Sequence, residues 1–276
     1  MDKKIDLDET LTERQQREKE YYEQFANSFD ITNEIDFTPV DGPLSGKERR
    51  PWNSYWATYE VSIDLFKKGA RLLDFGSGPG ENALRLSKIG YQIDGFDISE
   101  KNIEVSKQLF DKYKMSDKAT FQVSSAESLP YQDKSFEVIV GVDILHHIDI
   151  DKSVRECHRV LKDDGMAIFR EPLEVPILDF IRNLKIVKIF APTVKSFELH
   201  ITEDERKLNQ VDVEILKNIF PNMEMKKYLF LSRFDKFFRK GSDPQPSVLE
   251  KIDHFLITFI PGIKYLGGVV IFILKK

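Results

Sequence analysis

Three glycines at alternate positions constrain this chain more than any other feature of its sequence. A short apolar run at 71–75 enters a turn that contains Gly76, Gly78 and Gly80, and a helical pattern follows as far as Gly90. A strand, a tight glycine turn and a helix form the first half of a βαβ unit. Glycine permits positive φ and lets a ligand lie against the main chain, while the first N–H groups of the helix attract anionic groups. The segment therefore predicts an α/β fold with a ligand at this turn.

The next apolar segment predicts what kind of ligand this is. It spans 90–98 and ends with Asp97 and Ile98. A carboxylate at the end of a second strand can accept hydrogen bonds from both hydroxyls of a ribose, which indicates a nucleoside. The spacing Asp74-x-Gly76-x-Gly78-x-Gly80 departs from the G-x-G-x-x-G pattern of dinucleotide-binding folds. It therefore disfavours a nicotinamide-dependent oxidoreductase.

This spacing resembles motif I of the class I S-adenosyl-L-methionine (SAM) methyltransferases, and the resemblance extends over 72–169. It implies SAM as the cofactor, with Asp74 near the amino group of the methionine moiety. It also implies a Rossmann-like, seven-stranded and mostly parallel α/β sheet with an antiparallel last strand and helices on both faces. The segment between strands five and six is far longer than a usual connection, which indicates a helical insertion there. A non-catalytic SAM-binding or partner-binding module with the same fold is the alternative.

A loop at 124–131, after a strand at 119–123, resembles the family's adenine-binding loop, usually Asp-Ala-x-x-Leu-Pro-Phe. Ser125 stands where the family has Asp, and its hydroxyl is a weaker, neutral acceptor, whereas the N–H of Ala126 can still meet the ring. Near the start of the chain, Tyr21 and Tyr22 belong to a predicted helix that either packs at the edge of the domain or covers the cofactor. The predicted cofactor-binding residues are Asp74, Gly76, Ser77, Gly78, Gly80, Asp97, Ile98, Ser125, Ala126, Glu127, Val142, Tyr21 and Tyr22.

The candidate catalytic residues follow the next two strands. A strand at 135–142, apolar on both faces, leads to His146 and His147, and Glu171 ends the strand after it. Ligands of open α/β sheets bind at these carboxyl ends, so His146 is the candidate general base, although both histidines can instead position the loop. Glu171 either contacts the acceptor or holds the loop, and His200 is a further candidate to face the pocket. Methyl transfer from a sulfonium needs a base only when the nucleophile must lose a proton.

Four regions are predicted: an N-terminal helical cap at 1–68, the SAM-binding core at 69–172, a helical insertion at 173–225 and C-terminal strands at 226–276. Residues 37–50 are expected to form a loop, and strands six and seven to occupy 228–234 and 267–274. The insertion is interpreted as a substrate cover, with a lid packed on the core or a membrane-surface element as alternatives. An apolar helix at 248–260 is interrupted by charges, so it does not span a bilayer but can lie on one or line a pocket.

The composition of the chain limits which classes of partner and metal site it can have. A net charge of −5 without a long basic block argues against a nucleic-acid surface, and the single Cys157 excludes a disulfide framework and a Cys-rich zinc site. No metal is predicted. The charged start of the chain lacks an apolar signal region, which predicts a cytoplasmic protein. We expect a small-molecule acceptor of apolar or lipid-like character, while peripheral membrane contact and the oligomeric state stay open.

Overall fold

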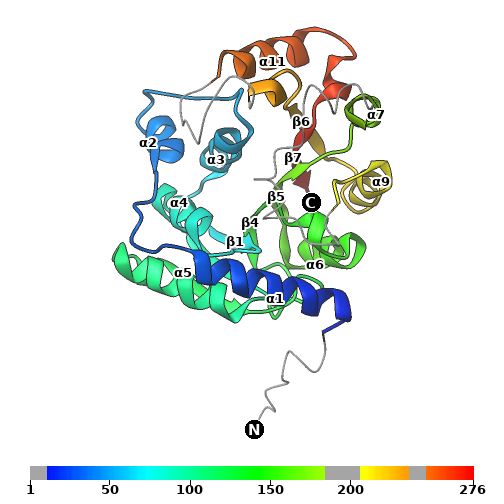
Figure 1. The fold of residues 1–276 in the computed structure, drawn as a ribbon. Coiled ribbons are helices and arrows are strands. Elements are labelled where there is room, and N and C mark those ends of the chain that lie inside the picture. Colours follow the sequence, from blue (N-terminus) through cyan, green and yellow to red (C-terminus); the bar gives the residue numbers. More distant parts are fainter. Residues whose placement is uncertain (1–10, 184–205, 236–246) are drawn as a thin grey trace.

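A seven-stranded sheet forms the centre of the molecule (Figure 1), which we describe from a computed structural model over residues 11–183, 206–235 and 247–276. The strand order is β3-β2-β1-β4-β5-β7-β6, and β7 alone runs antiparallel to its neighbours. The predicted fold is confirmed. The strands are β1 (Arg71–Phe75), β2 (Gln92–Asp97), β3 (Ala119–Val123), β4 (Phe136–Val142), β5 (Leu161–Pro172), β6 (Glu224–Tyr228) and β7 (Val269–Lys275).

Helices cover both faces of this sheet, as Figure 1 shows, because successive residues of a buried strand point to opposite sides. Leu72 of β1 belongs to a core with residues of α3, α4 and α5, whereas Leu73 belongs to a second core with residues of α6 and α9. The helices are α1 (Glu13–Ser28), α2 (Thr38–Leu44), α3 (Ser54–Leu65), α4 (Glu81–Ile89), α5 (Glu100–Lys112), α6 (Ile150–Val160), α7 (Pro176–Asn183), α9 (Gln210–Ile219) and α11 (Val248–Phe259).

The N-terminal helix α1 lies along α5 at one end of the molecule (Figure 1). It begins with a capping box, in which the Thr12 hydroxyl accepts from the N–H of Gln15 and the Gln15 side chain accepts from the N–H of Thr12. Such reciprocal bonds satisfy N–H groups that a helix start leaves unpaired. The predicted helix that contains Tyr21 and Tyr22 is confirmed.

Two local predictions are wrong. Part of the predicted loop at 37–50 is the helix α2, which tolerates Pro39 because a proline in the first helical turn removes no helical hydrogen bond. The sixth strand is Glu224–Tyr228 rather than 228–234. The sheet ends there because Leu229 has a φ of +64° and the next N–H groups, at 230–232, donate to the carboxylate of Asp253. The apolar sequence at 229–231 therefore belongs to a turn.

The region predicted as an insertion contains α7 and α9. Leu216 and Phe220 at the end of α9 are fully buried, in the same core as Cys157 of α6. This part of the region thus belongs to the helical layer of the core domain. No helix within the described ranges is both long enough and apolar enough to cross a bilayer.

Candidate active site

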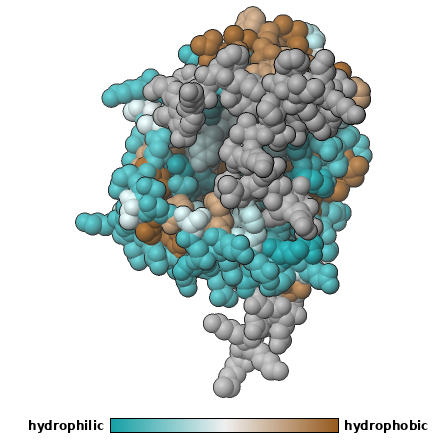
Figure 2. Space-filling view, in the orientation of Figure 1, coloured by the Kyte–Doolittle hydropathy of each residue, from teal (hydrophilic) through white to brown (hydrophobic). Residues whose placement is uncertain are grey.

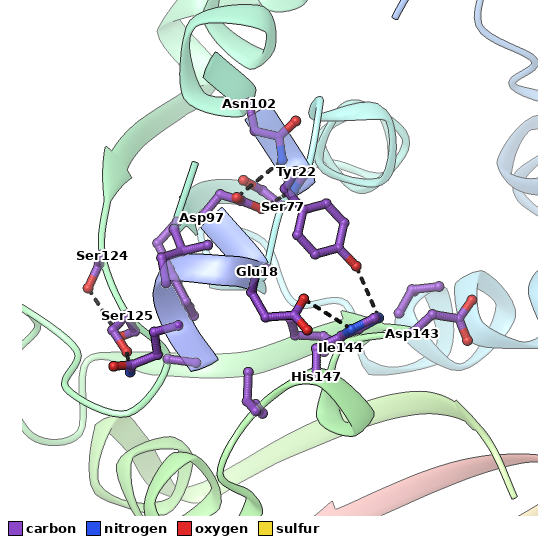
Figure 3. Close-up of a pocket in the computed structure, with 18 of the residues that line it drawn as sticks. Glu18, Tyr22, Ser77, Asp97, Asn102, Ser124, Ser125, Asp143, Ile144 and His147 are labelled. Carbon is purple, nitrogen blue, oxygen red and sulfur yellow. Dashed lines mark hydrogen bonds and ion pairs between the residues drawn. The ribbon is translucent and has the colours of Figure 1, made fainter. Parts of the chain in front are cut away.

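A cavity of about 200 Å³ lies at the carboxyl ends of β1, β2 and β4, with α1 forming its opposite wall (Figure 3). This is the edge of an open α/β sheet at which ligands bind. The predicted cofactor residues that line the cavity are Gly76, Ser77, Gly78, Asp97, Ile98, Ser125, Ala126, Glu127, Val142 and Tyr22. Asp74, Gly80 and Tyr21 are not in its lining, and of the predicted catalytic residues only His147 is. His200 lies outside the described residues.

The glycine turn brings main chain against this cavity. Gly76 and Gly78 have φ angles of +74° and +50°, which side chains rarely adopt. A Cβ at Gly76 would lie 2.8 Å from the side chain of Ile144, whereas a Cβ at Gly78 would meet no atom within 4 Å. Gly76 is therefore required by the packing of the turn. Gly78 leaves open space, as expected where a ligand lies against the backbone.

Asp97 ties the second strand to this turn. Its Oδ2 accepts from the N–H of Gly78 at 2.9 Å, and its Oδ1 accepts from the N–H of Ser99 and the side-chain amide of Asn102 at 2.9 and 3.2 Å. Burial raises the pKa of the Asp97 carboxyl, and these hydrogen bonds oppose that shift. The carboxylate is thus held rigidly at the cavity wall, where the sequence predicts contact with a ribose.

Asp74 lies at the end of β1 behind the turn and is only 2% exposed. Burial, followed by the charge of Asp97, raises the pKa of the Asp74 carboxyl to about 7. Its Oδ2 and the Oγ of Ser77 are buried polar atoms without a hydrogen-bond partner among the described residues. A buried carboxylate of this kind is stabilised by a nearby cation. The turn therefore suits a ligand that carries an ammonium group.

His146 and Glu171 form a buried pair outside the cavity. The Nδ1 of His146 lies 2.7 Å from Oε2 of Glu171, while Oε1 accepts from the N–H groups of Ile144 and Leu145 at 2.9 and 2.8 Å. Glu171 is fully buried. Of the two roles considered for Glu171, this geometry favours the second, which is to hold the β4–α6 loop against β5.

His147 points the other way, toward α1 (Figure 3). Its Nε2 lies 3.0 Å from the Tyr22 hydroxyl, and its Nδ1 lies 3.3 Å from Oε2 of Glu18. Both Glu18 and His147 are buried beside the cavity. Sequence reasoning missed Glu18, although its spacing of four residues from Tyr22 places both on one face of a helix.

The loop at 124–131, which resembles the family's adenine-binding loop, is also held by α1. The Ser125 hydroxyl accepts from the Gln15 side-chain amide at 2.9 Å and from the N–H of Glu127 at 3.2 Å. The carboxylate of Glu127 pairs with the guanidinium of Arg14. Neither Arg14 nor Gln15 was among the predicted site residues. The hydroxyl at position 125 thus has a local role that accounts for its presence, namely to fasten the loop to α1.

Asp143 is another cavity residue that the sequence analysis did not predict. Asp143, directly after β4, has a φ of +54°, and its carboxylate oxygens lie 2.7 and 2.5 Å from one nitrogen of Arg170. Strained backbone of this kind is concentrated at functional sites. Across the described residues, no three His, Cys, Asp or Glu side chains are grouped as they would be around a metal ion.

Comparisons with known proteins agree with this geometry. Residues 73–169 match the family model described as "Methyltransferase domain". The chain is 30% identical over 188 residues to "Uncharacterized methyltransferase YcgJ" of Bacillus subtilis, a match that covers 67% of this chain and 70% of that protein. It is 28% identical over 166 residues to the ubiquinone/menaquinone biosynthesis C-methyltransferase UbiE of Geotalea uraniireducens, with 58% of this chain and 65% of that one covered.

Two further comparisons concern a partial match and the fold. The chain is 36% identical over 112 residues to the 27-O-demethylrifamycin SV methyltransferase of Amycolatopsis mediterranei. This match covers 40% of this chain and 41% of that protein. The chain thus spans less than two thirds of two of these three relatives. Geranyl diphosphate C-methyltransferase of Streptomyces coelicolor has the same fold, with a TM-score of 0.60, 14% identity and coverage of 96% of this chain and 98% of that one.

Four findings indicate the same family: the order of the motifs, the strand order of the sheet, the position of the cavity and the similarity to YcgJ. The chain belongs to the class I SAM-dependent methyltransferases.

Proposed function

We propose that this methyltransferase moves the methyl group of SAM to a small acceptor with apolar or amphiphilic character. The observation that carries the proposal is the glycine turn: it leaves open space at Gly78, and the N–H of Gly78 holds the carboxylate of Asp97 at the edge of the same cavity. The acceptor class is supported by the relatives, whose names refer to ubiquinone and menaquinone, a rifamycin and geranyl diphosphate.

The lining residues suggest how this chain holds the cofactor. Asp97 would accept from the ribose hydroxyls, and the main chain at Gly78 would lie against the methionine end. Asp74 would stabilise the ammonium group through its charge from behind the turn. The N–H of Ala126 and the loop around Ser125 would meet the adenine. When bound, the cofactor supplies a methyl group activated by the sulfonium, and the protein positions the acceptor for in-line attack and excludes water.

Proton removal from the acceptor is assigned to His147. The carboxylate of Glu18 beside Nδ1 favours the tautomer with its proton on Nδ1, which leaves Nε2 as an acceptor toward Tyr22. The Tyr22 hydroxyl can then pass a proton from the acceptor to Nε2. His146 is instead assigned to positioning the loop through Glu171.

The volume of the cavity gives α1 a role in this scheme. About 200 Å³ is below the ~300–1,000 Å³ that small-molecule sites usually enclose. Gln15, Glu18 and Tyr22 of α1 fill the side away from the sheet. A small outward shift of α1 would enlarge the cavity, and its return would bring Glu18 and Tyr22 back to His147.

The test begins with calorimetry of S-adenosylhomocysteine binding to the wild type and to Asp97→Ala. We expect micromolar binding that the substitution weakens at least tenfold, since a ribose contact to a charged acceptor is worth ~1.5–3 kcal/mol. Unchanged affinity in the folded variant would refute the cofactor assignment. Methyl transfer is then measured with labelled SAM against quinols, prenyl diphosphates and polyketides. Tight binding without transfer to any acceptor would favour the non-catalytic alternative.

The base is tested once an acceptor is found. His147→Asn should lower kcat and leave KM nearly unchanged, because it removes a group that acts only in the chemical step. His158→Asn is the matched control, because His158 packs on Phe220 away from the cavity. An equal loss of kcat in both variants, or an unchanged kcat in His147→Asn, would exclude His147 as the base.

A further inference from the structure

The helix α11 turns its acidic side chains toward the protein and its apolar face toward solvent, which is the reverse of an ordinary surface helix. Its residue Asp253 is 2% exposed and accepts from three backbone N–H groups at 230–232 and from the Ser232 hydroxyl at 2.6–2.9 Å. Glu250 accepts from the N–H of Ser247 at 3.0 Å and from the side-chain amide of Asn53 at 2.7 Å. Both carboxylates of α11 are therefore engaged by the protein.

The opposite side of α11 presents a row of apolar side chains to solvent. Val248, Ile252, Phe255 and Phe259 have exposed fractions of 73%, 40%, 59% and 68%, and their spacing of four, three and four residues places them on one face. Figure 2 shows hydrophobic residues gathered at the end of the molecule where α11 lies in Figure 1. Tyr265, in the short helix η6 (Ile263–Leu266) that contacts α11, is 67% exposed.

The charges beside this apolar face are positive. Lys251 and Lys264 are exposed, and the ammonium groups of Lys227 and Lys264 lie 5.5 and 5.6 Å from the centre of the Tyr265 ring. Among the described residues, no carboxylate forms an ion pair with any of these three lysines. Burial and the charge of Lys264 lower the pKa of Lys227. An anion placed between the two ammonium groups would relieve their mutual repulsion.

We propose that α11 and η6 form a docking surface for the anionic face of a phospholipid bilayer. In this arrangement α11 lies parallel to the membrane, with Val248, Ile252, Phe255 and Phe259 at the boundary between head groups and acyl chains. Lys227 and Lys264 contact lipid phosphates, and Lys251 adds to the attraction. An apolar face with aromatic residues and flanking lysines is the pattern of helices that lie in a membrane interface.

Charge and size argue for lipid rather than a second copy of the chain. A two-fold dimer through this face would bring the lysines of both copies together without the carboxylates, which are turned inward. The apolar row belongs to a single helix of 12 residues, which is narrow for the ~800 Å² per partner that a stable interface buries. A bilayer requires only a row that can enter its surface.

The proposal is tested by flotation of the full chain with vesicles of phosphatidylcholine alone or with about one third phosphatidylglycerol. We expect binding to the anionic vesicles, weakened by added salt because exposed charges are screened. Phe255→Ser combined with Phe259→Ser should reduce binding at least tenfold. Lys227→Gln combined with Lys264→Gln should reduce it about 30-fold, since one lysine near an anionic surface contributes about fivefold.

Matched controls change the same residue types elsewhere. Val211→Ser removes an apolar side chain that is 63% exposed on α9, and Lys101→Gln removes a partly exposed lysine of α5. Both should bind as the wild type does, and all variants should keep their thermal unfolding midpoint. Wild-type binding by the phenylalanine or lysine double variant would overturn the proposal. So would a dimer in sedimentation that the phenylalanine double variant abolishes without any wild-type binding to vesicles.

Discussion

Asp74 gives the most quantitative prediction, because burial and the charge of Asp97 raise the pKa of its carboxyl from 3.8 to about 7. The folded protein therefore holds a proton at Asp74 that the unfolded chain releases at lower pH. The sign follows from linkage: the contribution of Asp74 to the free energy of unfolding falls as pH rises from about 4 to about 7, and is constant above that. Asp74→Asn removes this titration while keeping a neutral side chain of similar size.

The magnitude follows from the two pKa values, at ~1.4 kcal/mol for each tenfold change in the protonation equilibrium. The raised pKa of Asp74 costs the ligand-free protein about 2 kcal/mol at about pH 5.5, where the folded carboxyl is still protonated, and about 4 kcal/mol at about pH 8, where it is ionised. The stability of Asp74→Asn relative to the wild type should therefore increase by about 2 kcal/mol between these two pH values. A constant difference in hydrogen bonding between Asn and Asp does not affect this change.

The assay is urea unfolding at several pH values, followed by the fluorescence of Trp52 and Trp56. The control is Asp117→Asn at an exposed site, for which we expect no comparable change with pH. S-adenosylhomocysteine should bind Asp74→Asn more weakly than wild type, because its ammonium would no longer face a carboxylate. A stability difference that stays the same from about pH 5.5 to about pH 8 would refute the argument from burial.

Three further predictions concern the turn, α1 and the support of α11. Gly76→Ala should lower the free energy of unfolding by more than the ~1–2 kcal/mol that a positive φ costs an alanine, because its Cβ would also collide with Ile144. Gly78→Ala should mainly weaken cofactor binding. If the two variants lose stability in urea unfolding and affinity in calorimetry to the same extent, this distinction is wrong. Gln15→Ala should raise amide exchange rates along α1 by about tenfold, because it removes the capping box and the hydrogen bond to Ser125 in the loop at 124–131. Unchanged exchange rates, measured by mass spectrometry, would count against α1 as a cover of the cavity. Asp253→Ala should destabilise the protein by ~3 kcal/mol or more in urea, because three N–H groups lose a charged acceptor, and a loss below ~1 kcal/mol would show that water replaces it.

The parts of this protein that its sequence determined are those governed by neighbouring residues. β1 and β3 occupy the predicted residues, and the turn at Gly76 and Gly78 lies at the predicted edge of the sheet. Strand, turn and helix each depend on residues a few positions apart, so their pattern is visible in the chain. The sixth strand was misplaced because the reason it ends, Asp253, lies 21–23 residues further along.

Only the tertiary structure distinguished the two adjacent histidines. His146 turns to Glu171 on β5, and His147 turns to Glu18 and Tyr22 on α1. The hydrogen bond between Tyr22 and His147 joins residues 125 positions apart. It also decided which side of α11 faces the protein. The periodicity of a helix shows that it has an apolar face, but whether that face is buried depends on which distant groups need its polar side. In this chain the N–H groups at 230–232, just after β6, donate to Asp253 on the polar side of α11. The apolar face of α11 is therefore left at the surface.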